Sequence, residues 1–448
     1  MAIRIRKRLT KKEYIFNVIS LITVIVIGLY FGIRSIYYYS DQNNSKKVLD
    51  KKLALRVINT NRLTRGANGL HQDKDGYYFK GKVENNYVKF SNRSFRILRV
   101  NNDKTVKLIS DDNAAIFMWG EKNKYKNSNL NNWLNKTNNK NSGVYYDTIP
   151  SIDKFLIKTK YSEDKLLGDK VKKSNKTNSD YITTVSINDY VNAGGKNSYL
   201  NNGKYYWLIG HDKDKMNLYV NDNGEVEGGI NSDSYGVRAV ITMNKNVEVT
   251  TGDGTKNNPY IIEQNNNTNY IDQYVKIDND LYKVSKDKNG ILRLISNDYI
   301  KVNNVENKLP YSNNISLFSL LNINNIAYYL NNTYFNTLSY KDKLLDINNN
   351  IGEISDDTEL NYSNIFKESI STKVGLVNMF DYNTSDLTDY YLINTTSSIG
   401  NMAYVYNKVG ILEEAEVTEA KHIVPVIEIS KNRVKKGKGT KDKPYIVE

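Results

Sequence analysis

The sequence Gly252-Asp-Gly-Thr-Lys-Asn-Asn-Pro-Tyr-Ile-Ile-Glu263 recurs at the end of the chain as Gly437-Lys-Gly-Thr-Lys-Asp-Lys-Pro-Tyr-Ile-Val-Glu448. Eight of the twelve positions are identical, at an offset of 185 residues, and two of the chain's five prolines occupy the same position in both copies. We call this segment the coda. Its Gly-x-Gly-Thr pattern predicts a tight turn, and Pro-Tyr-Ile predicts a short strand at a sheet edge, where proline is tolerated.

Weaker matches extend this similarity upstream of each coda. The matching pairs are Tyr87–Phe90 with Tyr274–Ile277, residues 108–110 with 294–296, and residues 128–135 with 324–331. Similar offsets along the whole unit are the sign of a repeated folding unit. The sequence therefore predicts two homologous domains, at residues 76–263 and 268–448.

Each repeat has the pattern of short strands joined by turns. In the first repeat, alternation or apolar runs predict strands near residues 95–100, 106–109, 205–209, 217–220 and 237–243. Asn223-Gly224 predicts a hairpin, because both residue types tolerate positive φ. A single helix is expected at residues 130–134. The predicted fold class is α+β, with mainly antiparallel strands.

The N-terminus has the pattern of a membrane anchor. Twenty consecutive uncharged residues, 14–33, lie between Glu13 and Arg34, and as a helix they would be roughly 30 Å long, about the hydrocarbon thickness of a bilayer. Residues 1–13 carry a net charge of +5. The positive-inside rule then predicts a single-pass protein with a cytoplasmic tail at 1–13 and extracellular C-terminal domains. No small-residue cleavage motif follows the span, which favours an anchor over a signal peptide.

Residues 34–75 are predicted to form a stalk or linker. Ser45 could cap a short helix in which Leu49, Leu53 and Val57 recur at helical spacing. This helix could lie on anionic lipid or pack against the first repeat, and the sequence does not choose between them. The chain has no cysteine, so folding outside the cell would need no disulfide chemistry, as on a Gram-positive surface.

Four segments of the first repeat carry a resemblance to a known family. Taken in order, residues 87–97, 201–208, 234–241 and 252–262 resemble an uncharacterised family of bacterial surface domains, whose ends are similar to formylglycine-generating-enzyme-like domains. The resemblance implies a C-type-lectin-like fold, clearly for residues 76–263 and in outline for residues 270–448, and it implies no function. The chain departs from the family by having Phe95 in place of Trp and Ala239 in place of Pro.

Several kinds of chemistry are excluded by residue type. The absence of cysteine excludes a cysteine nucleophile, a thiolate zinc site and an iron–sulfur cluster. The chain also lacks the His-Glu-x-x-His, phosphate-loop and Gly-x-Ser-x-Gly motifs. We therefore predict no catalytic residue, no cofactor and no metal. The net charge of +14 is spread out beyond residue 13, which argues against a nucleic-acid partner.

The candidate ligand-binding residues are Trp207, Asp212, Asp214 and Arg238. Trp207 could stack on a sugar or pack in the core. Asp212 and Asp214 could ligate calcium through carboxylate oxygens, although the lysines between and after them oppose a cation, or they could lie in a solvated hairpin loop. Arg238 could meet a ligand or bond to the fold. Because the second repeat has Tyr391 and Val424 in place of Trp207 and Arg238, a polar site is expected in the first repeat.

These observations favour a membrane-anchored surface protein that binds or adheres to an envelope or host component. The expected ligand is a glycan, a wall polymer or a protein. Two alternatives remain: a cell-surface enzyme using carboxylate catalysis, and a structural or assembly protein of the envelope. A cleft with convergent carboxylates would favour the enzyme, and an exposed strand edge or apolar patch would favour the structural protein.

Overall fold

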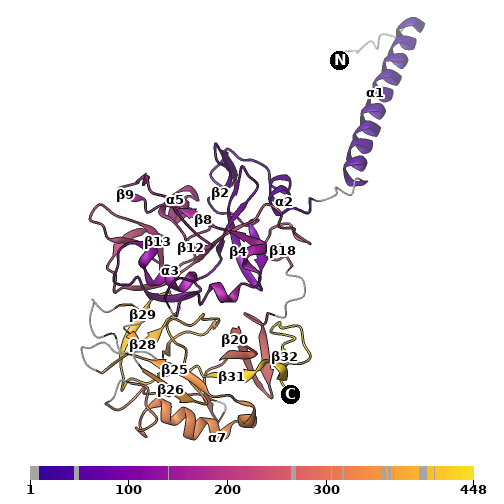
Figure 1. The fold of residues 1–448 in the computed structure, drawn as a ribbon. Coiled ribbons are helices and arrows are strands. Elements are labelled where there is room, and N and C mark those ends of the chain that lie inside the picture. The colour runs from indigo at the N-terminus through magenta and orange to yellow at the C-terminus, as the bar shows by residue number, and fades with distance from the viewer. Residues whose placement is uncertain are drawn as a thin grey trace, which may run out of the picture. The chain divides into compact units, whose positions relative to one another are not determined.

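The computed structural model describes most of the chain (Figure 1). The described residues are 10–44, 50–139, 141–263, 269–303, 305–314, 317–352, 354, 360–361, 365–366, 368–392, 401–407 and 409–448. They fall into two compact units, Met1–Asp50 and Lys51–Glu448. The second unit contains both repeats.

The first unit consists of one long helix, α1 (Lys11–Asn44). Its described large apolar side chains are all more than a third exposed, from Val18 at 38% to Phe16 at 70%. The predicted span 14–33 lies within α1, but the side chains of residues 14 and 17 are outside the described set. Among the residues that the structure describes, no helix is both long and apolar enough to cross a membrane. The predicted span is therefore not confirmed.

The first repeat contains a sheet of nine strands with the path β1-β2-β4-β5-β17-β12, to which β3, β18 and β7 are attached. All pairs in it are antiparallel except β18 with β3. The strands are β1 (Gly69–Asp73), β2 (Gly76–Lys80), β3 (Tyr87–Phe90), β4 (Arg93–Asn101), β5 (Val106–Ser110), β7 (Leu156–Ile157), β12 (Ile182–Thr184), β17 (Ala239–Met243) and β18 (Tyr260–Ile262).

A second sheet of this repeat has the path β10-β9-β13-β14-β15, with β16 joining β13 to β6. Its strands are β6 (Ala115–Met118), β9 (Lys165–Leu167), β10 (Lys170–Lys172), β13 (Tyr206–His211), β14 (Asn217–Val220), β15 (Val226–Gly229) and β16 (Ser234–Val237). The repeat also contains the helices α3 (Asn129–Leu134), α4 (Ile152–Phe155) and α5 (Ile187–Asn192) and the strand pair β8 (Thr159–Tyr161) and β11 (Asn178–Asp180). Helix α3 begins where Ser128 accepts a hydrogen bond from the Asn131 amide.

The second repeat has two sheets with the same connections. The order β32-β19-β20-β21-β31 corresponds to β18-β3-β4-β5-β17, and β24-β30-β27-β28-β29 corresponds to β6-β16-β13-β14-β15. The strands are β19 (Tyr274–Ile277), β20 (Asp280–Lys288), β21 (Ile291–Ser296), β24 (Lys308–Leu309), β27 (Tyr390–Tyr391), β28 (Met402–Tyr406), β29 (Leu412–Glu416), β30 (Lys421–His422), β31 (Val426–Ser430) and β32 (Tyr445–Ile446). This shared topology matches the repeated sequence motifs.

The second repeat also contains further short elements. They are the pairs β22 (Lys301–Val302) with β23 (Val305–Glu306) and β25 (Ile347–Ile351) with β26 (Glu368–Thr372), and the helical run α6 (Ile326–Tyr328), η4 (Tyr329–Tyr334) and α7 (Phe335–Thr337). Taken together, the described chain is α+β and mostly antiparallel sheet, as the sequence predicts.

The coda forms the same structure in both repeats. Gly252 and Gly437 have φ values of +103° and +142°, and a Cβ at either would lie 1.9 Å or 2.3 Å from the carbonyl oxygen of the coda proline. Both positions therefore require glycine. After the turn, β18 and β32 add as parallel strands at a sheet edge, next to β3 and β19.

The predicted stalk is wrong at its C-terminal end, because residues from Lys51 onward belong to the second unit. Helix α2 (Leu53–Thr60) packs on the first repeat through Leu53 and Val57, which are 1% and 0% exposed, and β1 joins the first sheet. The sequence left open whether this helix packs or lies on lipid, and the structure shows that it packs. Ser45 and Leu49 lie outside the described residues.

Candidate functional site

Trp207 lies in the interior of the first repeat and is 0% exposed. Its ring packs against Trp119 and Tyr235, with centroid distances of 5.3 and 4.7 Å. Its indole Nε1 donates to the carbonyl of Phe117 at 3.1 Å. The side chain has no surface left for a sugar, so the core interpretation of Trp207 holds and the ligand interpretation is wrong.

Arg238 is also 0% exposed. Its guanidinium donates to the carbonyl oxygens of Ser110, Leu200 and Asp111 and lies 5.0 Å from the ring centroid of Tyr206. Every one of these partners belongs to the fold. Arg238 therefore joins loops of the first repeat and is not available to a ligand.

Asp212 and Asp214 lie in the loop between β13 and β14. The Asp212 carboxylate accepts hydrogen bonds from the amides of Asp214 and Met216, both at 2.8 Å, which is the bonding of a tight turn. Asp214 is exposed. In the described part of the chain, no three His, Asp or Glu side chains gather closely enough to hold a metal ion. The structure thus brings none of the four predicted residues together in a pocket.

A cavity with a volume of about 610 Å³ lies elsewhere, where the two repeats meet. We call it the inter-repeat cleft. The first repeat contributes residues from β3, the start of β4 and the loop after β5. The second contributes residues before β19, the loop at 382–388 and the turn of its coda. The sequence predicts a polar site in the first repeat, whereas this cavity draws on both repeats.

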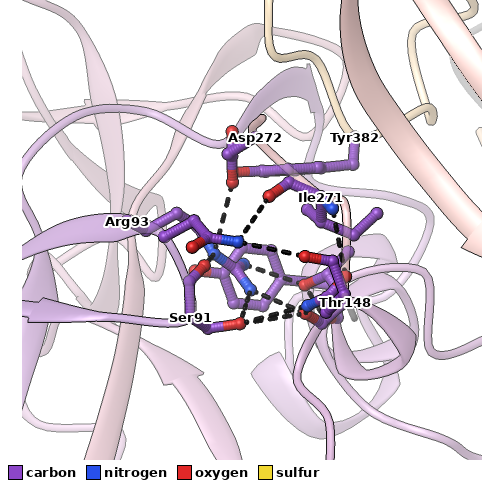
Figure 2. A network of polar contacts seen from close by, with 9 residues as sticks. Ser91, Arg93, Thr148, Ile271, Asp272 and Tyr382 are labelled. Atoms are coloured by element: carbon purple, nitrogen blue, oxygen red, sulfur yellow. Dashed lines mark hydrogen bonds and ion pairs between the residues drawn. The ribbon is translucent and has the colours of Figure 1, made fainter. Parts of the chain in front are cut away.

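A polar network connects the two repeats beside this cleft (Figure 2). Arg93, at the start of β4, donates to the hydroxyl and the carbonyl of Thr148, each at 2.8 Å. Its Nε lies 3.4 Å from the carboxylate of Asp272, in the second repeat. The same carboxylate accepts a hydrogen bond from the Tyr382 hydroxyl at 2.7 Å, and the Asn92 amide donates to the Ile271 carbonyl.

Asp272 has the environment of a structural carboxylate. Its side chain is 9% exposed, and burial raises its pKa above the ordinary aspartate value, although the positive charge of Arg93 opposes the shift. A raised carboxyl pKa in a cleft can mark a proton-transfer site. Here, however, the Asp272 carboxylate already pairs with Arg93 and accepts a hydrogen bond from Tyr382. These contacts join the two repeats.

The cleft carries more positive than negative charge. Two ion pairs are satisfied within it, Arg93 with Asp272 and Lys204 with Asp112 at 2.6 Å. The remaining lysines of its wall form no ion pair with a described carboxylate; they are Lys89, Lys283, Lys438 and Lys441. Of the other two lining acids, Asp111 pairs with Arg96 at 3.6 Å. Asp386 forms no ion pair with a described cation, so four unpaired lysines stand against one unpaired carboxylate.

A buried hydroxyl without a partner lies in the same wall. Thr384 is 4% exposed, and its Oγ1 has no hydrogen-bond partner among the residues that the structure describes. Leaving a buried polar atom without a hydrogen bond costs free energy. A ligand that hydrogen-bonds to this hydroxyl would remove that cost. We regard Thr384 and the four unpaired lysines as the candidate binding groups.

Sequence reasoning missed these residues because their proximity comes from the packing of one repeat on the other. One signal was present in the sequence. The position occupied by Asp253 in the first coda is occupied by Lys438 in the second, and only the second coda faces the cleft. Comparing the two copies for reversed charges would have pointed to this turn.

Comparison of the chain with models of protein families, with curated proteins and with solved structures gave no match. The interpretation of the site therefore rests on its own geometry.

Proposed function

We propose that this protein binds a component of the bacterial envelope or of a host surface in the inter-repeat cleft, without transforming it. The observation that carries the proposal is the cleft of about 610 Å³, a size within the range of about 300–1,000 Å³ found for ligand pockets. Its wall includes the unpartnered Thr384 hydroxyl, to which a bound molecule could supply the missing hydrogen bond.

Two features support binding over catalysis. The carboxylate with the raised pKa, Asp272, is already engaged by Arg93 and Tyr382. The cleft also draws on both repeats, so duplication of the domain creates a binding surface that one copy would lack. A C-type-lectin-like fold for each repeat, which the sequence resemblance implies, agrees with a glycan or wall polymer as the ligand.

Placement at the cell surface is part of the same proposal. It rests on the basic residues that precede α1 and on the exposure of the described apolar side chains of that helix, because an extended apolar surface needs a covering. Fractionation of cells tests it. The chain should sediment with membranes and be released by detergent, and release by high salt alone would contradict the proposal.

The binding function can be tested with sacculi, that is, peptidoglycan carrying its attached polymers, from a Gram-positive bacterium. The full-length protein in detergent should co-sediment with them. Ser94→Trp places a large ring in the cleft from an exposed position of β4 and should abolish co-sedimentation. Ser371→Trp, at an exposed position of β26, is the matched control and should bind normally.

Two results would overturn the proposal. If the wild-type protein stays in the supernatant, the sacculus is not its ligand. If Ser94→Trp sediments as well as Ser371→Trp, binding occurs outside the cleft.

A further inference from the structure

We infer that the inter-repeat cleft selects an anionic polymer, whose phosphate or carboxylate groups meet Lys89, Lys283, Lys438 and Lys441 while Thr384 bonds to an oxygen of the same ligand. This inference rests on the proposed binding function and specifies the ligand class. It starts from the excess of unpaired cations in the cleft wall.

Comparison of the repeats shows one position at which the positive charge is found only on the side of the cleft. Position 253 in the first coda is an aspartate, whose carboxylate accepts hydrogen bonds from the amide and hydroxyl of Thr255. The equivalent residue of the second coda is Lys438, in the cleft wall. The same turn is thus kept in both copies, and its charge is reversed where it faces the cleft.

A second difference concerns Lys283 on β20. Its equivalent in the first repeat is Arg96, which is 4% exposed and donates to the Asn86 side chain and the Val83 carbonyl. Lys283 is half-buried and lies 5.6 Å from the ring centroid of Tyr274, as Arg96 stacks on Tyr87. The cation that is buried in the first repeat therefore reaches the cleft in the second.

Lysines at the rim and a hydroxyl in the wall suit an extended anion. Lysine binds phosphate and carboxylate as a point charge, and exposed lysines attract a polyanion in a way that weakens with salt. The hydroxyl of Thr384 can donate to a phosphate, carboxylate or sugar oxygen. A neutral glycan would use the hydroxyl and leave the lysines without partners.

Binding of three defined polymers to the full-length protein tests this inference. The probes are sodium polyphosphate, polygalacturonate and neutral dextran, measured by isothermal titration calorimetry at low and high salt. We expect one or both polyanions to bind and dextran not to bind, with an affinity that falls as salt rises. Which polyanion binds more tightly distinguishes a phosphate-bearing ligand from a carboxylate-bearing one.

The chain provides a matched pair of double variants. Lys89 and Lys441 line the cleft, and their equivalents in the other repeat, Lys276 and Lys256, do not. Lys89→Gln/Lys441→Gln should weaken polyanion binding at least about tenfold and reduce its salt dependence. Lys276→Gln/Lys256→Gln removes the same charge and should leave binding within about twofold of wild type.

Thr384→Val distinguishes a role of the hydroxyl in ligand binding from a role in stability. Because the hydroxyl has no partner in the described part of the chain, the variant should be at least as stable as wild type in thermal unfolding, yet it should bind the polyanion more weakly. Equal weakening by both lysine doubles, or dextran binding as tightly as the polyanions, would overturn the anion inference while leaving a cleft ligand possible. If Ser94→Trp binds the polyanion as tightly as wild type, the binding site does not lie in the cleft.

Discussion

Arg238 shows at the scale of a single residue why a charged side chain in a strand-rich repeat need not mark a site. Its guanidinium has five donors in a fixed plane, and it donates to the carbonyl oxygens of Ser110, Leu200 and Asp111. The second repeat has Val424 at this position. The loop carbonyl oxygens of the second repeat must therefore accept hydrogen bonds from other donors.

Replacing Arg238 by valine, the residue of the other repeat, should destabilise the protein strongly. The carbonyl oxygens of Ser110 and Asp111 would lose their hydrogen bonds from the guanidinium, at about 1–3 kcal/mol each, whereas the Leu200 carbonyl keeps one from the Tyr206 hydroxyl. We therefore expect a loss of at least about 2 kcal/mol in the free energy of unfolding. Urea denaturation followed by tryptophan fluorescence measures this. Arg62→Val, at an exposed position, is the control, and an equal loss in both variants would contradict the assigned role.

The pair of Asp73 and Arg99 gives a pH dependence. Two hydrogen bonds, at 2.7 and 2.6 Å, join them, and this bonding by Arg99 holds the pKa of Asp73 below its ordinary value. A carboxylate with a lowered pKa contributes stability above its unfolded pKa, and the contribution disappears as the pH falls through the folded pKa. Because Asp73 is partly exposed, the contribution is under about 1 kcal/mol.

Asp73→Asn should therefore lower the melting temperature slightly at pH 7, and the difference from wild type should vanish in the acid range. Thermal melts between pH 7 and pH 2 measure it. A difference that persists unchanged at the lowest pH would show that the ion pair is not its source.

At the scale of elements, the packing of α2 moves the boundary of the folded region to Lys51. The helix is short, and isolated helices of this length are marginal in water. It is stable here because Leu53, Ala54 and Val57 are buried against the first repeat and the Leu53 amide donates to the Val247 carbonyl. The helix thus links the start of the folded unit to the segment that precedes the coda.

Leu53→Ala should cost about 2–5 kcal/mol of unfolding free energy, as expected for a buried leucine. Leu55→Ala lies two residues further along the same helix, where the side chain is 37% exposed, and should cost far less. Chemical denaturation of both variants measures the difference. Similar small losses would mean that α2 is a detached stalk.

At the scale of the whole molecule, the repeats share an extensive interface. Phe380 of the second repeat packs on Phe117 of the first, with a centroid distance of 4.9 Å. Its carbonyl accepts a hydrogen bond from the indole of Trp133 at 2.8 Å. A further ion pair joins Lys288 to Asp147. With so much shared burial, residues 51–448 should unfold as one cooperative unit.

Phe380→Ala should remove this coupling. We expect a single calorimetric transition in the wild type, and in the variant a loss of about 3–5 kcal/mol together with separation into two transitions. Phe335→Ala, in α7 and away from the interface, should lower the transition temperature without splitting it. A variant at Phe380 that still melts in one unshifted transition would show that the repeats are held together by other contacts.

The sequence alone determines the duplication, the strand-rich α+β class and the coda, because these depend on local patterns: glycines that need positive φ, apolar alternation and a proline at an edge. The inter-repeat cleft, the burial of Trp207 and Arg238 and the attachment of α2 were decided by tertiary structure. They depend on contacts between residues that are far apart in the sequence, such as Trp207 with Phe117, 90 positions apart, and Arg238 with Ser110, 128 positions apart. Local sequence patterns carry no information about such contacts.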